Sequence, residues 1–342
     1  MKIFELRIFT PLSLEEFLRG DEYMFHKGAK EMSHDGQGVE WLLDEPWERD
    51  GSVGKHTMRR MYIEERVPKW VRKLFPPEAW IIEEESFSAG PYSKTTYKDL
   101  YMKDDFLLSC ETIRVAGVST LTNPLNLPPN EIKNCPVHVI DLSQPPPKGK
   151  EYDVGLDPTR WKSEKTNRGP LTQPGWWKAF HNRPHGTAAE EEQRRQEFDK
   201  MQKQFGKKPL PDETDAITKA PFAFSHPISD TECGLPEHLR YSTNKEQPYP
   251  MPVVTAHKVI KFHFKWWGLQ TIMENYSVSL CQKIYTGTHK QITCWLDEYF
   301  DLDFTGIAQA AEEMDAAATA AATAEKKEIK YLDDGDESEA PK

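Results

Sequence analysis

Hydrophobic and polar residues alternate over much of the first 142 positions, which is the pattern of β-strands with one buried face. Turn-forming pairs such as Asp50-Gly51 separate the alternating runs. After the first run, Ser13 and Glu16 form a capping box, which predicts a helix that continues to about Lys30. A short amphipathic helix is expected at 67–75. The predicted strands cover residues 2–9, 38–44, 56–64, 80–88, 94–101, 106–115 and 137–142.

The pattern changes between residues 143 and 252, where prolines recur and apolar periodicity is weak. We interpret this stretch as a connection that contains an insertion at about residues 178–248. Within the insertion, Thr187 and Glu190 can cap a charged helix that ends near Gly206. This helix is too polar to lie in a core, so we expect it on the surface.

Regular patterns return near the end of the chain. Residues 255–266 alternate as a strand, and from Gln270 apolar residues recur four apart, which predicts a long helix. Helical spacing continues to Tyr299. Together, the elements predict an α+β fold in which a helix near the C-terminus lies over a meandering, mostly antiparallel sheet. We expect a single domain at 1–310, followed at 311–342 by an Ala-rich helical extension and an acidic, disordered tail.

Charge and composition narrow the function. The formal net charge of the chain is −11, and more than half of it lies in the last 31 residues, which hold ten acids and four lysines. The rest is only mildly acidic and has no concentrated basic face, which argues against nucleic-acid binding. No apolar run is long enough to cross a bilayer, and the N-terminus does not resemble a secretory signal. We therefore expect a cytoplasmic protein with five reduced cysteines.

Common catalytic signatures are absent from the sequence, including the nucleophile elbow, the dinucleotide-binding glycine motif, the P-loop and the HExxH motif. His181 and His185 have the spacing of metal ligands, but Pro184 between them prevents a helical pair. We therefore predict no enzyme activity, no metal site and no cofactor.

Several predicted strands carry polar residues on an otherwise apolar face. Lys258 shares a face with Ile260 and Phe262, so it either has a buried partner or extends to water from a frayed strand end. By the same alternation, Thr57 and Arg59 share one face of residues 56–64. The same holds within 80–88 for Glu84, Ser86 and Ser88.

The Trp266-Trp267 pair joins the last strand to the long helix. Neighbouring residues of a strand point in opposite directions, so both indoles cannot easily be buried. Exposed indoles beside Lys261 and Lys265 are typical of a membrane interface. We predict that Trp266 and Trp267 dock on a membrane. If they were core residues instead, their removal would unfold the protein.

Seven segments, in order along most of the chain, make the sequence similar to the phosphatidylinositol transfer protein family. Single pieces are weak signals, but seven in register are specific, and the Lys-Trp-Trp-Gly-Leu-Gln block is the strongest of them. Typical single-domain members have no counterpart of the insertion. The matching segments are 38–51, 67–68, 91–92, 101–107, 165–171, 264–270 and 294–297.

This resemblance implies a fold related to the steroidogenic lipid-transfer (START-like) domains, in which a strongly curved sheet encloses one phospholipid and a long C-terminal helix closes the cavity. It also matches Ser163 to a family position regarded as a kinase target; the alternative is that Ser163 is an inert loop serine. Arg59 stands where the family commonly has lysine, and Ser88 where it has asparagine. A headgroup-linked glutamate of the family aligns with Ala311, one place before Glu312. The implied headgroup contacts are Thr57, Arg59, Glu84, Ser88, Thr95 and Lys258.

The expected function is therefore a phospholipid carrier that exchanges phosphatidylinositol for phosphatidylcholine between membranes, acts as a monomer and touches membranes transiently. Two alternatives stay open. Ser88 and Ala311 would also suit a carrier of phosphatidylcholine or phosphatidic acid only. The insertion would suit an interaction protein that senses lipid or presents it to a lipid kinase.

Overall fold

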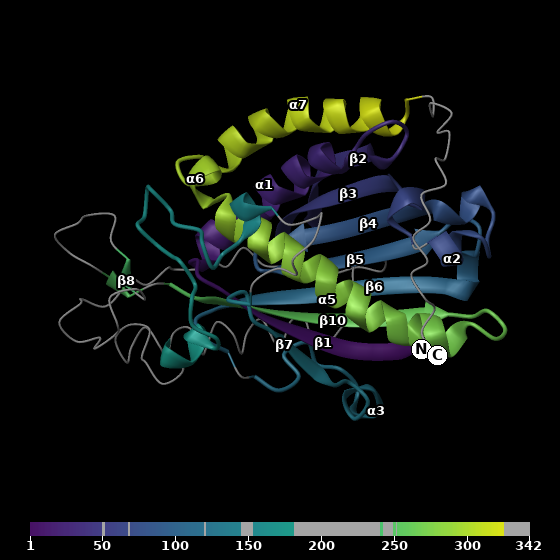
Figure 1. The fold of residues 1–342 in the computed structure, drawn as a ribbon, viewed down its shortest axis with the longest axis horizontal. Helices are drawn as coiled ribbons and strands as arrows, with labels where there is room; N and C mark the ends of the chain where they lie inside the picture. Colours follow the sequence, from purple (N-terminus) through teal and green to yellow (C-terminus); the bar gives the residue numbers. More distant parts are fainter. Residues whose placement is uncertain are drawn as a thin grey trace.

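An eight-stranded sheet forms the centre of the protein in the computed structural model (Figure 1). The structure describes residues 1–49, 52–67, 69–119, 121–144, 153–180, 240–241, 249–250 and 252–324. The strands of the large sheet are β1 (Lys2–Thr10), β2 (Gly38–Arg49), β3 (Ser52–Tyr62), β4 (Ile81–Ala89), β5 (Tyr92–Asp99), β6 (Phe106–Ala116), β7 (Val137–Ile140) and β10 (Val254–Phe264).

The strand order is β2-β3-β4-β5-β6-β10-β1-β7. Strands β2 to β6 are neighbours in chain order, and all neighbours are antiparallel except β1 and β7, which are parallel. The predicted α+β class and the mostly antiparallel sheet are confirmed. Because β10 pairs between β1 and β6, the late strand with Lys258 lies in the middle of the sheet.

Helix α1 (Leu14–Met32) begins at the predicted capping box, in which the Ser13 side chain accepts from the Glu16 backbone and the Glu16 side chain accepts from the Ser13 backbone. The helix packs tightly against α6 (Leu296–Tyr299). At Gly20, an added Cβ would lie 2.5 Å from the Tyr299 ring. Glycine is therefore required there by the close approach of the two segments.

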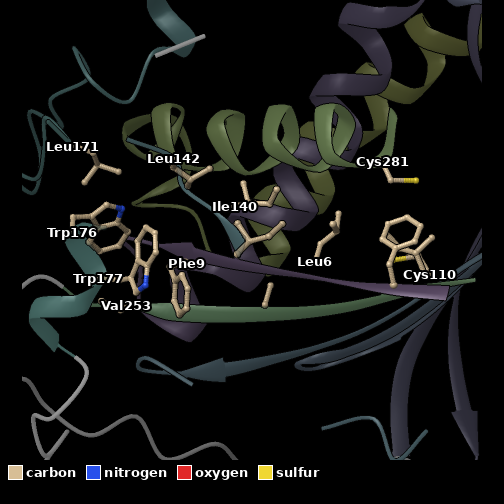
Figure 2. Close-up of a cluster of buried hydrophobic side chains, with 14 residues drawn as sticks. Leu6, Phe9, Cys110, Ile140, Leu142, Leu171, Trp176, Trp177, Val253 and Cys281 are labelled. Atoms are coloured by element: carbon tan, nitrogen blue, oxygen red, sulfur yellow. The ribbon is translucent and has the colours of Figure 1, made fainter. Parts of the chain in front are cut away.

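Helix α5 (Gln270–Cys294) crosses one face of the sheet, which we call the inner face (Figure 1). Its Cys281 packs in a core with Leu6, Cys110 and Ile260, side chains of β1, β6 and β10 (Figure 2). The four-residue spacing predicted this helix correctly. However, three of the apolar residues that revealed it are exposed: Ile272, Leu280 and Ile284.

Helix α7 (Phe304–Ala322) lies beside α1 and the β2 edge of the sheet (Figure 1). Its contacts are made largely by small residues, with Ala318 packed against Ala29 and Val39. The Trp41 amide donates to the Thr319 hydroxyl at 3.0 Å, and the Gly36 amide to the Ala321 carbonyl at 2.9 Å.

Shorter elements complete the described part of the chain. The predicted helix at 67–75 is reduced to α2 (Lys69–Arg72), and the predicted helix between Thr187 and Gly206 lies outside the described residues, as do His181 and His185. The remaining elements are η1 (Glu64–Arg66), η2 (Pro77–Trp80), η3 (Lys103–Asp105), α3 (Pro129–Ile132), η4 (Val154–Leu156), η5 (Trp176–Phe180), β8 (Arg240–Tyr241) and β9 (Tyr249–Pro250).

No helix among the described residues is both long and apolar enough to span a bilayer.

Candidate functional site

The strand register aligns polar side chains of the inner face into rows that run across the sheet. The first row joins β3 to β5 through Arg59, Glu84 and Tyr97. The second row joins Thr57, Ser86 and Thr95 on the same three strands. The third row runs farther, to β10, and contains Lys55, Ser88, Ser93, Thr112 and Lys258. Thus the six residues expected to contact a headgroup all lie on one face.

Arg59 and Glu84 form a buried ion pair at the first row. The Arg59 Nε and Nη2 atoms both donate to Glu84 Oε1, at 2.8 and 2.5 Å. The guanidinium also stacks on the Phe25 ring of α1, 3.5 Å from its centroid, and lies 5.3 Å from the Trp41 ring. Because Arg59 is held on both sides, the pair is neutral and rigidly placed.

Hydroxyl groups dominate the middle of the inner face. The Ser86 and Thr95 hydroxyls are hydrogen bonded to each other at 2.9 Å, and Ser88 and Thr95 are half-buried. Tyr97 lies on β5, between β4 and β6. Its side chain is half-buried, and desolvation together with the Glu84 carboxylate raises its pKa well above the ordinary value. A central strand keeps such accessibility only where its inner face is incompletely covered.

Lys258 is the buried cation of the third row. Its side chain is 6% exposed, and its Nζ lies 3.4 Å from the Thr112 hydroxyl and 4.8 Å from the Tyr285 ring centroid. No described carboxylate forms an ion pair with it. Burial, followed by the nearby Arg114 charge, lowers its pKa. The possibility that Lys258 extends to water from a frayed strand end is therefore wrong.

The structure adds an arginine that the sequence patterns did not single out. Arg114 is buried on the inner face of β6, and its Nη2 atom lies 2.5 Å from Asp21 of α1. Its Nη1 atom donates to the Ser93 hydroxyl at 3.2 Å. The signal was present, because Thr112 and Arg114 alternate onto one face of the predicted strand, as Thr57 and Arg59 do.

A second charged cluster joins four elements near the middle of α1. Lys55 forms ion pairs with Glu22 of α1 and with Asp44 of β2, the latter at 2.8 Å. The His26 Nδ1 atom of α1 lies 2.8 Å from Asp315 of α7. We call these five residues the α7 clamp.

Proton affinities in the α7 clamp reflect its ion pairs. Burial alone would lower the pKa of His26, but hydrogen bonds to Asp315 and Glu22 raise it. Burial would likewise raise the pKa of Glu22, but His26 and Lys55 lower it to about 2. Ligand atoms of His26, Asp44 and Asp315 lie within 4.8 Å of one another. Since Lys55 and His26 already neutralise most of the acidic charge, we interpret the cluster as a structural clamp.

The tryptophan pair is exposed as expected, but unequally. Trp267 is 98% exposed, whereas Trp266 is 37% exposed and its ring lies 4.9 Å from the Phe75 ring. Gly268 follows with a positive φ of 78°, which turns the chain into α5. Trp267 is therefore not a core residue, whereas Trp266 is partly exposed and also packs against Phe75.

Ser163 is fully buried and densely bonded, and its assignment as a kinase target or an inert serine stays a prediction. Its hydroxyl donates to Asp297 at 2.5 Å and accepts from the Thr166 hydroxyl at 2.7 Å. Nearby, the Arg168 Nη1 and Nη2 atoms donate to Glu16, at 2.9 and 2.5 Å. A kinase would reach Ser163 only after this connection opened.

Comparison with known proteins connects this arrangement to a family. A family model described as phosphatidylinositol transfer protein matches residues 1–197 and 230–316. The chain belongs to the phosphatidylinositol transfer protein family. It is 28% identical to the human phosphatidylinositol transfer protein beta isoform and 27% identical to phosphatidylinositol transfer protein 1 of Dictyostelium discoideum, with 90% of each chain covered in both cases.

Another relative of the family is much longer than this protein. The chain is 28% identical to the Drosophila melanogaster protein retinal degeneration B, of which the match covers 20%. The resemblance expected from the seven segments is thus confirmed, and the observed sheet with its C-terminal helices agrees with the fold of this family. Ala311, which aligns with the headgroup-linked glutamate of the family, is buried on α7, and Glu312 is exposed.

Proposed function

We propose that the protein is a non-enzymatic carrier that binds one phosphatidylinositol or phosphatidylcholine molecule on the inner face and exchanges it between membranes. Lys258 carries the proposal. A buried ammonium without a carboxylate partner among the described residues costs several kcal/mol unless another anion compensates it. A lipid phosphate is such an anion, and the adjacent Thr112 hydroxyl can donate a hydrogen bond to it.

The other rows can serve an inositol ring. Sugar hydroxyls need donors and acceptors, and the half-buried hydroxyls of Ser86, Ser88 and Thr95 are both. Glu84 adds an acceptor, held in place by Arg59. This division assigns the phosphate to the β6–β10 end of the inner face and the ring to the β3–β5 strands.

The acyl chains require an apolar path. Moving a chain from bilayer to water costs about 0.8 kcal/mol per CH₂, so a carrier must surround it with its own apolar side chains. A cluster of such residues lies toward the end of β10 that leads to the tryptophans. Its members are Phe75, Met102, Phe106, Leu108, Phe262, Phe264, Leu269 and Met273.

Exchange needs docking and an opening. Trp267 and Trp266 would insert their indoles into the membrane interface, beside the exposed Lys265. Helix α7, held by small residues and by the α7 clamp, would be the element that moves. Lipid enters and leaves as the intact molecule, with no bond made or broken.

Two measurements test the proposal. Mass spectrometry of lipid that copurifies with the protein should find phosphatidylinositol and phosphatidylcholine. In a transfer assay with labelled lipid, each protein molecule should move many lipid molecules between vesicles. Phosphatidic acid as the only anionic cargo would instead support the alternative cargo. Absence of any bound or transferred lipid would overturn the carrier function.

The docking step has its own variants. Replacing Trp266 and Trp267 together with alanine should abolish transfer, while Trp267→Ala alone should cause most of the loss and leave the melting temperature unchanged because its indole is 98% exposed. Lys283→Ala, an exposed position on α5, is the control for general surface changes. Wild-type transfer by the double variant would contradict the docking role.

A further inference from the structure

His289 is a buried histidine with one unsatisfied nitrogen. It lies on α5 and is 1% exposed, and its Nδ1 atom is 2.9 Å from the Thr10 hydroxyl of β1. Its Nε2 atom has no hydrogen-bond partner among the described residues. Burying a polar nitrogen without a partner is unfavourable, so a partner is expected in the functional state.

The surroundings of His289 are cationic. The Phe17 ring of α1 lies 5.2 Å from the imidazole, and the Arg114 guanidinium lies 5.5 Å from the Phe17 ring. The charged groups that act on His289 are Lys258 from β10 and Arg114 from β6, and together with burial they lower its pKa well below the ordinary value. Asp21 of α1 is nearby but is paired with Arg114. The imidazole is therefore neutral in the lipid-free protein.

We propose that His289 contacts the phosphate of a bound anionic lipid through Nε2 and takes up a proton when that lipid binds. This inference rests on the proposed function and extends it to a residue outside the expected headgroup set. If the Thr10 hydroxyl donates to Nδ1, the ring proton resides on Nε2, which can then donate to a phosphate oxygen.

Binding and protonation are coupled by electrostatics. A phosphate beside the ring offsets the charges of Lys258 and Arg114, and therefore raises the pKa of His289 in the complex above its value in the lipid-free protein. A group that binds a proton more tightly in the complex makes the complex more stable as pH falls. Anionic lipid should accordingly bind more tightly at lower pH.

The coupling also discriminates between lipids. Phosphatidylinositol brings one uncompensated negative charge, whereas phosphatidylcholine carries its own cation next to the phosphate. The pKa of His289 should rise more with the first lipid than with the second. The ratio of bound phosphatidylinositol to bound phosphatidylcholine should therefore increase as pH falls.

The experiment loads the full chain by competition from vesicles that contain equal amounts of both lipids, and measures bound lipid by mass spectrometry between about pH 8 and pH 6. Phosphatidylinositol is a suitable probe because its phosphodiester does not titrate in this range. We expect the ratio in the wild-type protein to rise about three- to tenfold. Calorimetry in two buffers of different ionisation enthalpy should detect the accompanying proton uptake.

Two variants separate contact from structure. His289→Asn keeps an amide near the Nδ1 position that can pair with Thr10 but removes Nε2, and should lower phosphatidylinositol loading. His289→Gln keeps a donor near Nε2 that cannot take up a proton, and should restore loading with a ratio independent of pH. Melting temperatures identify any variant that fails to fold.

Each outcome decides a different statement. A pH-independent ratio in the wild-type protein, or an unchanged pH dependence in His289→Gln, would overturn the role of His289, and both tests are independent of how His289→Asn folds. If the wild-type protein loads neither lipid at any pH, the proposed carrier function itself fails. Loading of both lipids without pH dependence would leave the carrier intact and remove this inference alone.

Discussion

The two ends of the inner face hold similar residues in different electrostatic states. At the β3–β4 end, Arg59 is paired with Glu84 and stacked on Phe25, so its charge is balanced within the protein. At the β6–β10 end, Lys258 has no carboxylate partner among the described residues and contacts the Thr112 hydroxyl at 3.4 Å and the Tyr285 ring. Both cations are buried on the same face of one sheet.

This difference separates two ways of using a buried positive charge. A self-compensated pair positions its carboxylate and tolerates an empty site, whereas an uncompensated ammonium is unstable until an anion arrives. Under the proposed function, the first end would read the identity of a headgroup and the second would bind the phosphate common to all phospholipids. The following changes test that division, beginning with the largest expected effect.

Lys258→Met should remove the phosphate contact and with it the binding of every phospholipid, by about a hundredfold or more. The same change should raise the melting temperature of the lipid-free protein, since it removes a buried charge. Lipid loading and thermal unfolding measure the two effects. Lys261→Met is the control on the same strand, because Lys261 faces away and pairs with Glu131. A variant that still loads both lipids would show that Lys258 is not the phosphate ligand.

Arg59→Ala should suppress phosphatidylinositol transfer at least about tenfold, roughly 1.4 kcal/mol, and nearly retain phosphatidylcholine transfer. The change leaves Glu84 buried without its cation, which disfavours an ionised carboxylate that accepts a hydrogen bond from an inositol hydroxyl. Thr57→Glu, at the next inner-face position of β3, should have the same selectivity because it adds an acid beside the ring. Vesicle transfer of each lipid is the measurement.

The double variant Arg59→Ala with Glu84→Gln provides the control for stability. Removing both charges should restore the melting temperature that the single change lowers, but not the transfer of phosphatidylinositol. A parallel loss of both lipids in Arg59→Ala would assign this pair to folding and contradict its role in headgroup selection.

Ser163→Glu should lower the transfer of all lipids together by severalfold, because the change lies at neither end of the inner face. The new carboxylate would oppose Asp297, which now accepts from the Ser163 hydroxyl at 2.5 Å. Limited proteolysis should detect opening of the connection. Ser163→Ala, which adds no charge, serves as the comparison. If only one lipid were affected, the connection would have to contact the headgroup.

The smallest effect is expected at the α7 clamp. The pKa of His26 is raised above its ordinary value of 6.5, so its stabilising contribution is fully present below about pH 6.5 and is lost as pH rises through the higher folded-state pKa. Asp315→Asn should therefore lower the free energy of unfolding by about 1 kcal/mol near pH 6 and by less near pH 9, which melting temperatures at the two pH values would measure. An equal effect at both pH values would exclude His26 protonation as the cause.

Local chemistry in the sequence was sufficient for much of the fold. The capping box at Ser13 placed the start of α1, and alternation placed most strands, because both depend on neighbours within a few residues. Alternation also put Thr57 with Arg59 and Lys258 with Ile260 on shared faces. The family resemblance added the functional assignment, which no pattern of polarity supplies.

Tertiary structure decided the partners and the orientation of the elements. The four-residue spacing predicted α5 but not which of its faces packs on the sheet. Ile272, Leu280 and Ile284 point to solvent, while Cys281 and His289 face the sheet. Likewise, Lys258 and Arg114 lie far apart in sequence, and only the pairing of β10 with β6 brings their charges beside His289. Whether a buried charge is compensated depends on such distant contacts, because electrostatic interactions act through space and not along the chain.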